Sequence, residues 1–237
     1  MTESHQSSAA APQSLADLTH FQCGILLASG SPRRRMLLSS VGFELRVRPV
    51  AIDETPVTGE RAAPYVLRVA GEKGQAAHAR DGHWLTGGAN RVLIAADTTV
   101  SIAGQILGKP ADVQEARAML GQLAGQQHEV LTAVYMATAT ADSLELDRSL
   151  IQFAPLSDAV IDAYVATGEP MDKAGAYGIQ GLGAVLVERI EGSFSGVAGL
   201  PLARVERMLR SLGIDPWALR DGSLRNTPTA NREGGAV

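Results

Sequence analysis

The sequence predicts an α/β fold in which a mixed β-sheet is flanked by helices. Short apolar runs that are typical of buried strands alternate with segments of helical periodicity, but not in the strict strand–helix–strand order of a purely parallel sheet. Two long runs rich in β-branched residues, 129–139 and 144–153, are joined by a short connection around Asp142, which predicts an antiparallel pair. We expect two lobes around a cleft.

A single folded domain is expected over residues 21–220. The chain has 237 residues and a formal net charge of −4, which suits one sizeable domain with enough apolar residues for a core. Residues 1–20 are rich in Ser, Ala and Gln and lack the basic start and apolar centre of a signal peptide. Residues 221–237 hold almost no large apolar side chains, so both ends are expected to be disordered tails.

Charge, cysteine content and hydropathy exclude several classes of partner. The mild acidity argues against a nucleic-acid surface, which would need a basic patch. No apolar run reaches the length of a membrane span. Cys23 is the only cysteine, so no disulfide can form within the chain. We therefore expect a cytoplasmic location in a reducing compartment, with neither nucleic acid nor membrane as a partner.

The first elements are a strand, a helix and a second strand. Residues 24–28 form an apolar run that predicts a buried strand. Ser31 is a favourable N-cap and Pro32 suits the first helical position, so a helix is expected from Pro32 to about residue 41. Alternation of apolar and polar side chains over residues 43–50 then predicts a half-buried strand.

The middle of the chain combines a long helix with a hairpin. An apolar stripe over residues 60–80 predicts a helix, and three glycines in residues 81–90 predict a loop. Residues 91–96 form a second apolar strand that is expected to end at an aspartate. Residues 100–103 and 106–108 then predict a small hairpin.

Capping residues mark the later helices. Asp112 and Glu115 form a capping box for a helix reaching residue 123, and Ser157 is expected to cap a helix that ends near residue 166. Residues 184–190 predict a strand, and residues 201–212 predict the final helix.

The turn after Ser31 is the first candidate site, because it carries Arg33, Arg34 and Arg35. Cations are disfavoured at a helix N-terminus, so three arginines there are electrostatically unusual. The free backbone N–H groups and the guanidinium forks together predict a bound anion, most readily a phosphate. The alternative is a solvated arginine cluster.

Carboxylates and lysines add to this site. Asp97 is expected directly after a buried strand, where carboxylates often face a cleft. Glu54 lies in a polar turn, and Lys73 and Lys109 are isolated lysines. Taken singly, these three have an ordinary alternative as solvated surface groups. Together, hard oxygen ligands without a histidine or cysteine cluster suit Mg²⁺ or Mn²⁺ and predict metal-assisted phosphate chemistry.

A glycine-rich segment allows the backbone to approach a ligand closely. Its four glycines match neither a Walker loop nor a dinucleotide fingerprint, so the segment alone assigns no function. They are Gly175, Gly178, Gly181 and Gly183.

Several of these segments resemble, in the same order, the motifs of the Maf family of nucleoside triphosphate pyrophosphatases, also called septum formation inhibitors. The matching segments are residues 28–34 (ASGSPRR), 96–100 (ADTTV), 108–110 (GKP), 172–180 (DKAGAYGIQ) and 199–201 (GLP). The resemblance extends over residues 26–212. One departure is Gly108, which stands where the family often has a glutamate.

The resemblance implies a Maf/ITPase-like fold with a long mixed sheet, a deep cleft and often a homodimer. It implies hydrolysis between the α and β phosphates of a nucleoside triphosphate, with Asp97 as the proton acceptor. It also places Arg34, Glu54, Lys73 and Lys109 in the same site.

Substrate preference is implied by three further positions. Arg33, Thr98 and Gln180 match the branch of the family that prefers dTTP and UTP, with a house-cleaning role and a link to cell-division arrest. On this reading Glu54 and Asp97 would hold the Mg²⁺ or Mn²⁺ ion. The Gln180 amide could hydrogen-bond the pyrimidine edge.

The remaining assignments are substrate binding by Ser29 and Ser31, and phosphate neutralisation by Arg34 and the two lysines. The alternative is a nucleotide-binding regulator of septation in which hydrolysis is incidental, because the same cleft would serve both.

Overall fold

The computed structural model describes residue 18 and residues 24–220, and within them seven strands form one sheet in the order β2-β1-β3-β5-β6-β7, with β4 paired to β3. The strands are β1 (Gly24–Leu27), β2 (Leu45–Val47), β3 (Arg91–Ile102), β4 (Gln105–Leu107), β5 (Gln127–Ala137), β6 (Asp142–Phe153) and β7 (Val187–Glu191). The helices are α1 (Pro32–Ser40), α2 (Ala62–Thr86), α3 (Val113–Leu123), α4 (Asp158–Ala166), α5 (Phe194–Val197) and α6 (Leu202–Ser211), with short 3₁₀ turns η2 (Glu169–Asp172), η3 (Ala174–Ala176) and η4 (Leu182–Leu186).

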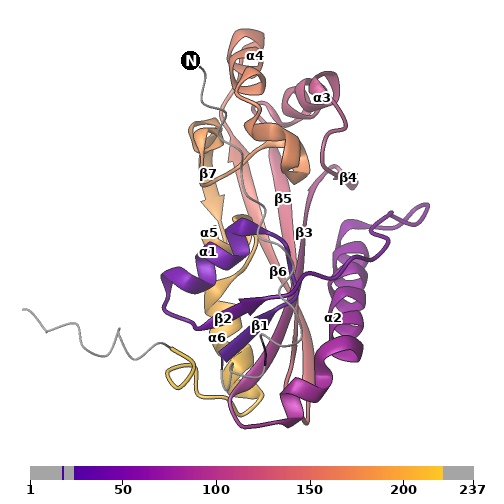
Figure 1. The fold of residues 1–237 in the computed structure, drawn as a ribbon. Coiled ribbons are helices and arrows are strands. Elements are labelled where there is room, and N and C mark those ends of the chain that lie inside the picture. The colour runs from indigo at the N-terminus through magenta and orange to yellow at the C-terminus, as the bar shows by residue number, and fades with distance from the viewer. Residues whose placement is uncertain (1–17, 19–23, 221–237) are drawn as a thin grey trace, which may run out of the picture.

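The sheet is mixed, as predicted. β1 pairs in parallel with β2 and β3, whereas β3, β5, β6 and β7 pair antiparallel to one another. The predicted antiparallel pair is β5 and β6, which are the two strands after the β3–β4 hairpin (Figure 1). The helix-flanked mixed sheet confirms the predicted fold class, while the division into two lobes stays a prediction.

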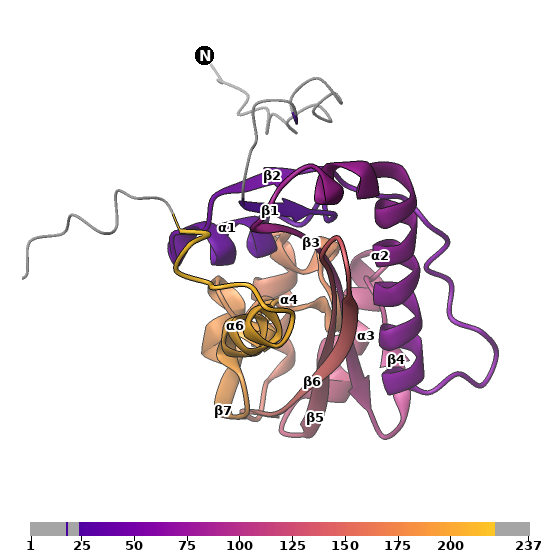
Figure 2. The same ribbon diagram turned by 90° about the horizontal axis from the view of Figure 1, so that it is seen from below.

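Helices cover both faces of the three long strands. Seen from below, α2 lies on one side of β3, β5 and β6, and α6 lies on the other (Figure 2). The alternation of side chains explains this, because Leu93 and Tyr135 face the α2 side while Ile94 and Val134 pack in the cluster that contains α6. Both faces are therefore core faces.

Close packing of α2 on the sheet depends on a glycine in the middle of the helix. A Cβ atom at Gly74 would lie 2.1 Å from the Tyr135 ring of β5, so no larger residue fits at this distance. The backbone of α2 thereby approaches the sheet around position 74. This approach brings the neighbouring Lys73 side chain to the surface of β3.

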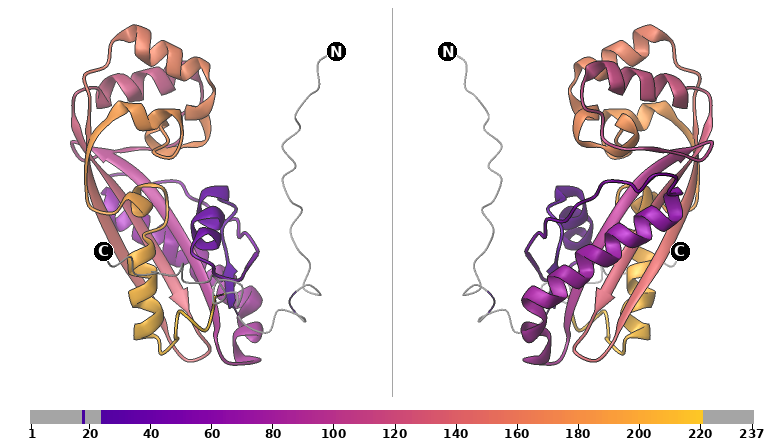
Figure 3. Two further views of the ribbon diagram at one scale, coloured as in Figure 1. Left: turned by 90° about the vertical axis from the view of Figure 1, so that its left-hand side faces the viewer. Right: turned by 90° about the vertical axis from the view of Figure 1, so that its right-hand side faces the viewer.

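A separate cluster closes one end of the sheet. The side views show α3 and α4 gathered there, away from β1 and β2 (Figure 3). Leu120, Leu123 and Phe153 are fully buried in this cluster, and Tyr177 from the glycine-rich segment packs against them. The segment is thereby anchored in the core rather than left as a free loop.

The predicted helix caps are confirmed. The Ser31 hydroxyl accepts a hydrogen bond from the Arg34 amide, Ser157 does the same for Val160, and Asp112 caps α3 through the Glu115 amide.

Two predicted boundaries near the site were wrong. Residues 81–86 continue α2 instead of forming a loop, because Asp81 is fully buried between Arg48 and Arg80, and Trp84 continues the apolar stripe. The strand expected to end at residue 96 runs on as β3 to Ile102, so Asp97 lies inside a strand and not after one. Pairing with β5 across this position keeps the strand continuous.

Two further strand predictions were too long. Within residues 43–50 only β2 is a strand, followed at position 48 by backbone outside regular structure. The first residues of the strand expected over 184–190 belong to the 3₁₀ turn η4, and β7 begins at Val187.

The predicted disordered tails fall on residues outside the described part of the chain, apart from Leu18. That side chain is buried with Leu26 and Trp84. In the part that the structure describes, no helix is both long and apolar enough to cross a bilayer.

Candidate active site

One pocket of about 480 Å³ is lined by ten of the side chains that the sequence assigned to a site. It lies between the start of α1, the loop 51–61, the middle of β3 and the segment 172–180. Its lining includes Ser29, Ser31, Arg33, Arg34, Glu54, Lys73, Asp97, Thr98, Lys109 and Gln180. Segments that are far apart in the sequence thus converge on one cavity.

Two of the three arginines after Ser31 line the pocket. Arg33 and Arg34 are among the lining residues, whereas Arg35 is exposed and is not among them. Anion binding by the arginine cluster stays a prediction for Arg33 and Arg34, and Arg35 lies outside the pocket because side chains on consecutive helical residues diverge.

Arg34 is held in place by three hydrogen bonds. Its Nε donates to the Gly199 carbonyl at 2.9 Å, Nη1 to the Ser29 hydroxyl at 2.9 Å, and Nη2 to the Thr98 hydroxyl at 3.1 Å. Burial lowers the pKa of its guanidinium, and the nearby Asp97 carboxylate opposes that shift. A guanidinium has five N–H donors, so two remain for an anion.

A hydroxyl chain extends from Arg34 into the sheet. Thr132 of β5 lies opposite Thr98 of β3, and their hydroxyl oxygens are 2.9 Å apart. The Thr132 hydroxyl donates to the Gly196 carbonyl at 2.8 Å, so it accepts from Thr98, which in turn accepts from Arg34. Thr132 supports the site, and the sequence analysis missed it because only the strand register brings it to Thr98.

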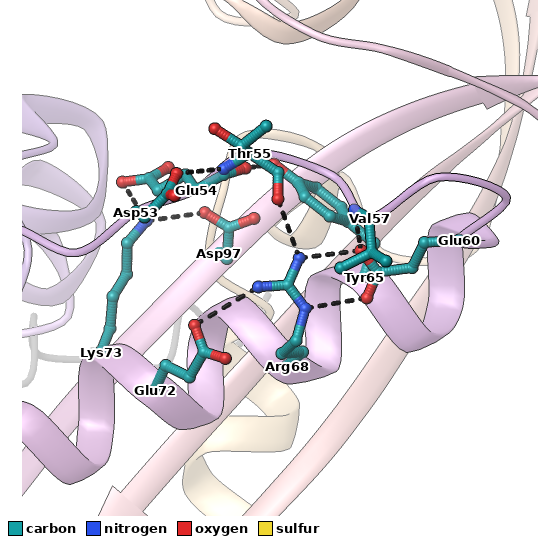
Figure 4. Close-up of polar contacts among 10 residues, drawn as sticks. All are labelled: Asp53, Glu54, Thr55, Val57, Glu60, Tyr65, Arg68, Glu72, Lys73 and Asp97. Carbon is teal, nitrogen blue, oxygen red and sulfur yellow. Dashed lines mark hydrogen bonds and ion pairs between the residues drawn. The ribbon is translucent and has the colours of Figure 1, made fainter.

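Lys73 joins the two predicted carboxylates. Its Nζ lies 2.8 Å from Glu54 Oε1 and 2.9 Å from Asp97 Oδ1, as Figure 4 shows. The Lys73 and Asp97 side chains are only 10% and 9% exposed, whereas Glu54 is 48% exposed. The strand-borne acid is thus fixed in the core, and the loop-borne acid reaches it from the surface.

The adjacent acid in the same turn has a different role. Asp53 Oδ1 accepts a hydrogen bond from the Thr55 amide at 2.9 Å, and Asp53 is not among the pocket-lining residues. Of the two neighbouring carboxylates, only Glu54 reaches the pocket.

The donor set suits a hard divalent cation bound together with a phosphate ligand. Over residues 18 and 24–220 no three Asp, Glu, His or Cys side chains gather into a metal-holding group. Glu54 and Asp97, however, both contact Lys73 Nζ and so lie close together, and Mg²⁺ commonly binds through one or two carboxylates with substrate phosphates and water completing its shell. These residues therefore fit Mg²⁺ or Mn²⁺ in a substrate complex.

Lys109 and Gln180 also line the pocket. Lys109 follows β4, and the Gly175 amide donates to the carbonyl of the preceding Gly108 at 3.0 Å. Gln180 lies exposed at the end of the glycine-rich segment. Arg33 Nη1 contacts Asp172 Oδ2 at 3.1 Å, which connects the start of α1 to the same segment.

Tyr177 fastens the glycine-rich segment to the sheet. Its hydroxyl lies 2.8 Å from His128 Nε2 of β5, and its ring packs edge-on against Phe153. Burial raises the pKa of Tyr177 and lowers the pKa of His128 to about 4, so both are neutral near pH 7. The sequence analysis missed this pair, since neither residue type nor spacing links the two positions.

Comparison with known proteins identifies the family of the chain. The family model described as Maf-like protein matches residues 24–212. A dTTP/UTP pyrophosphatase of Anaeromyxobacter dehalogenans (strain 2CP-1) is 48% identical over 198 residues, which cover 81% of this chain and 96% of that protein.

Two further relatives carry the same name. The dTTP/UTP pyrophosphatase of Methylobacillus flagellatus is 48% identical over 190 residues, covering 80% of this chain and 93% of the relative. The dTTP/UTP pyrophosphatase of Pasteurella multocida is 44% identical over 200 residues, which cover 84% of this chain and 99% of that protein. The match extends over nearly all of the described fold, and the chain belongs to the Maf-like protein family.

Proposed function

We propose that this chain is a nucleoside triphosphate pyrophosphatase that hydrolyses dTTP and UTP to the monophosphate and pyrophosphate. The observation that carries the proposal is the contact of Lys73 Nζ with both Asp97 and Glu54 in a pocket that also holds Arg34 and Lys109. Cations around a pair of acids suit attack on a polyphosphate, and relatives at 44% to 48% identity are named for this activity.

Asp97 is the proton acceptor in this proposal. Lys73 occupies Asp97 Oδ1, so Oδ2 would take the proton from the water that attacks the α phosphorus. The bond to the bridging oxygen then breaks, and pyrophosphate leaves with the electron pair of that bond. Arg34 and Lys109 would neutralise the charge on the phosphates and on the departing pyrophosphate.

Glu54 and Asp97 would hold a divalent cation, Mg²⁺ or Mn²⁺. When bound, the ion would polarise the phosphate oxygens and offset their negative charge. The protein's contribution is to keep the two carboxylates converging on one point, which the packing of α2 on β3 achieves through Lys73.

The opposite wall of the pocket would recognise the nucleoside. Gln180 is exposed there, and its amide can both donate and accept hydrogen bonds, as a pyrimidine edge requires. Arg33 and Thr98 line the same pocket. Ser29 and Ser31 flank the N-terminus of α1, where backbone N–H groups favour an anion.

The test is pyrophosphate release from a panel of ribo- and deoxyribonucleoside triphosphates with Mg²⁺ or Mn²⁺. We expect fast turnover of dTTP and UTP and slow turnover of purine nucleotides. Tight binding of dTTP without turnover would instead favour a nucleotide-binding regulator. Equal turnover of all nucleotides would contradict pyrimidine recognition by Gln180.

A further inference from the structure

The loop that carries Glu54 has no regular secondary structure of its own. Residues 48–61 lie outside the helices and strands, between β2 and α2. Glu54 is nevertheless aimed at Lys73, although its side chain is 48% exposed and has little packing around it. Some other contact must therefore fix this loop.

Arg68 of α2 supplies that contact through its whole guanidinium fork (Figure 4). Its Nε and Nη2 donate to the two carboxylate oxygens of Glu60 at 2.9 and 2.8 Å, and Nη2 also donates to the Thr55 carbonyl at 3.2 Å. Glu60 Oε2 in turn accepts the Val57 amide at 3.0 Å. A bidentate pair of this kind fixes geometry as well as charge.

The contacts reach two successive peptide carbonyls, those of Glu54 and Thr55. The Thr55 carbonyl, one residue after Glu54, is held by Arg68, and the Glu54 carbonyl itself accepts the Tyr65 hydroxyl at 3.0 Å. Arg68 and Tyr65 both lie on α2, the helix that also carries Lys73. The helix α2 thus carries Lys73 and also holds the loop that brings Glu54 to Lys73.

We propose that Arg68 is a positioning residue, which clamps Glu60 and the Thr55 carbonyl so that Glu54 stays beside Asp97. The inference rests on the proposed function, in which Glu54 and Asp97 act together on a metal-bound nucleotide. Arg68 itself is not among the pocket-lining residues, so it would act only through the loop.

The ion pair persists over the working pH range. The Arg68 guanidinium and the Val57 amide lower the pKa of Glu60 to about 2, so this carboxylate stays charged at any pH where the protein is assayed. The clamp is therefore a fixed feature and not a pH switch.

The chain offers a matched control in the other partner of Arg68. Glu72 lies one helical turn further on and accepts from Arg68 Nη1 at 3.3 Å, without touching the loop. Glu72→Gln removes a carboxylate charge that pairs with Arg68 but leaves the contacts of Arg68 with Glu60 and Thr55 intact. Glu60→Gln removes the charge on the loop side.

The experiment compares Arg68→Gln, Glu60→Gln and Glu72→Gln in dTTP hydrolysis at varied Mg²⁺ concentration. For the first two we expect the half-saturating Mg²⁺ concentration to rise about tenfold, the lower end of the effect usual for residues that orient metal ligands. For Glu72→Gln we expect a change below twofold. Melting temperatures identify any variant that has lost its fold.

A double variant separates positioning from a general loss of structure. In the Glu54→Gln background the loop no longer carries the carboxylate, so adding Arg68→Gln should change turnover by less than about twofold. A further tenfold loss in that background would overturn the proposal, because Arg68 would then act by another route.

Hydrogen exchange provides a readout that needs no activity. The Val57 amide donates to Glu60 within the clamp, and the Thr55 amide donates to Asp53 in the same loop. We expect exchange over residues 51–61 to become faster in Arg68→Gln and Glu60→Gln but not in Glu72→Gln. Faster exchange with unchanged kinetics would overturn the positioning role. Inactivity of the wild-type protein on every nucleotide, with this exchange pattern present, would refute the proposed function and leave the clamp established.

Discussion

Two segments that line the pocket, 51–61 and 172–183, are held in place by different kinds of interaction. The loop 51–61 is held by a charged clamp that is partly exposed, since Arg68 is 27% exposed and Glu60 is 11% exposed. The segment 172–183 is held from inside, where Tyr177 and His128 are 6% and 2% exposed and hydrogen-bond as neutral groups. One fastening depends on charge, the other on burial.

The difference predicts how each side responds to solution conditions. Exposed ion pairs weaken as salt screens them, but the Arg68–Glu60 pair does not titrate near neutral pH. A buried histidine is little affected by salt, but it must be uncharged to stay buried. Salt should therefore loosen the Glu54 side, and acid should loosen the Gln180 side.

The largest expected effect is the loss of kcat on substitution of Asp97, which lies on β3 and belongs to neither segment. Asp97→Asn should stay folded and lose at least about a hundredfold in kcat, the scale of a general base. The assay is pyrophosphate release from dTTP, with Asp158→Asn on α4 as control, since that side chain is 87% exposed and lies outside the pocket lining. Near-normal kcat in Asp97→Asn would remove this residue from the mechanism.

Acid should weaken the buried fastening through His128. The pKa of His128 is about 4 in the folded protein, against an ordinary value near 6.5. Between pH 4 and pH 6.5 the unfolded chain therefore binds a proton at this residue that the folded protein does not. Stability is then fully present above pH 6.5 and falls towards pH 4, by about 2 kcal/mol between pH 7 and pH 5.

Urea unfolding at both pH values measures this loss. In His128→Gln, which cannot titrate, the difference in unfolding free energy between pH 7 and pH 5 should be smaller by about the same 2 kcal/mol. An identical pH dependence in wild type and variant would show that His128 is not the group responsible.

A smaller effect is expected from removing one hydroxyl at each fastening. Tyr177→Phe leaves His128 Nε2 buried without its partner, which should cost about 1–2 kcal/mol of unfolding free energy at pH 7. Tyr65→Phe, on the loop side, should cost less, because the Glu54 carbonyl is exposed and water can replace the lost donor. The reverse order in chemical denaturation would contradict the assignment of a buried and an exposed fastening.

The smallest effect on the unfolding free energy is expected at the exposed ion pair between Asp172 and Arg33. Asp172 is 66% exposed and pairs with Arg33, so Asp172→Asn should change the unfolding free energy by less than about 1 kcal/mol. A loss of several kcal/mol would mean that the segment 172–183 is held mainly by this surface contact and not by Tyr177.

The sequence could predict what local chemistry decides. Ser31, Ser157 and Asp112 cap helices as expected, and the family motifs contain eight of the ten predicted side chains that line the pocket. The other two, Glu54 and Lys73, lie outside the quoted motifs. Family membership followed from the order of those motifs.

What the sequence could not predict depends on contacts between distant segments. The extension of α2 to Thr86 depends on arginines that surround Asp81, and β3 continues through Asp97 because Lys73 on another element balances its charge. The Thr132 hydroxyl chain likewise exists only once β5 pairs with β3, and the Arg68 clamp exists only once the loop 51–61 folds back onto α2. No pattern within one element encodes them.

Gly74 has a consequence for how this protein can move. Because α2 sits directly on the sheet there, the helix that carries Lys73 and Arg68 is packed against β3, which carries Asp97. These elements form one packed block that is continuous in the sequence. We therefore expect Lys73 and Asp97 to keep their mutual spacing when a nucleotide binds, whichever base it carries.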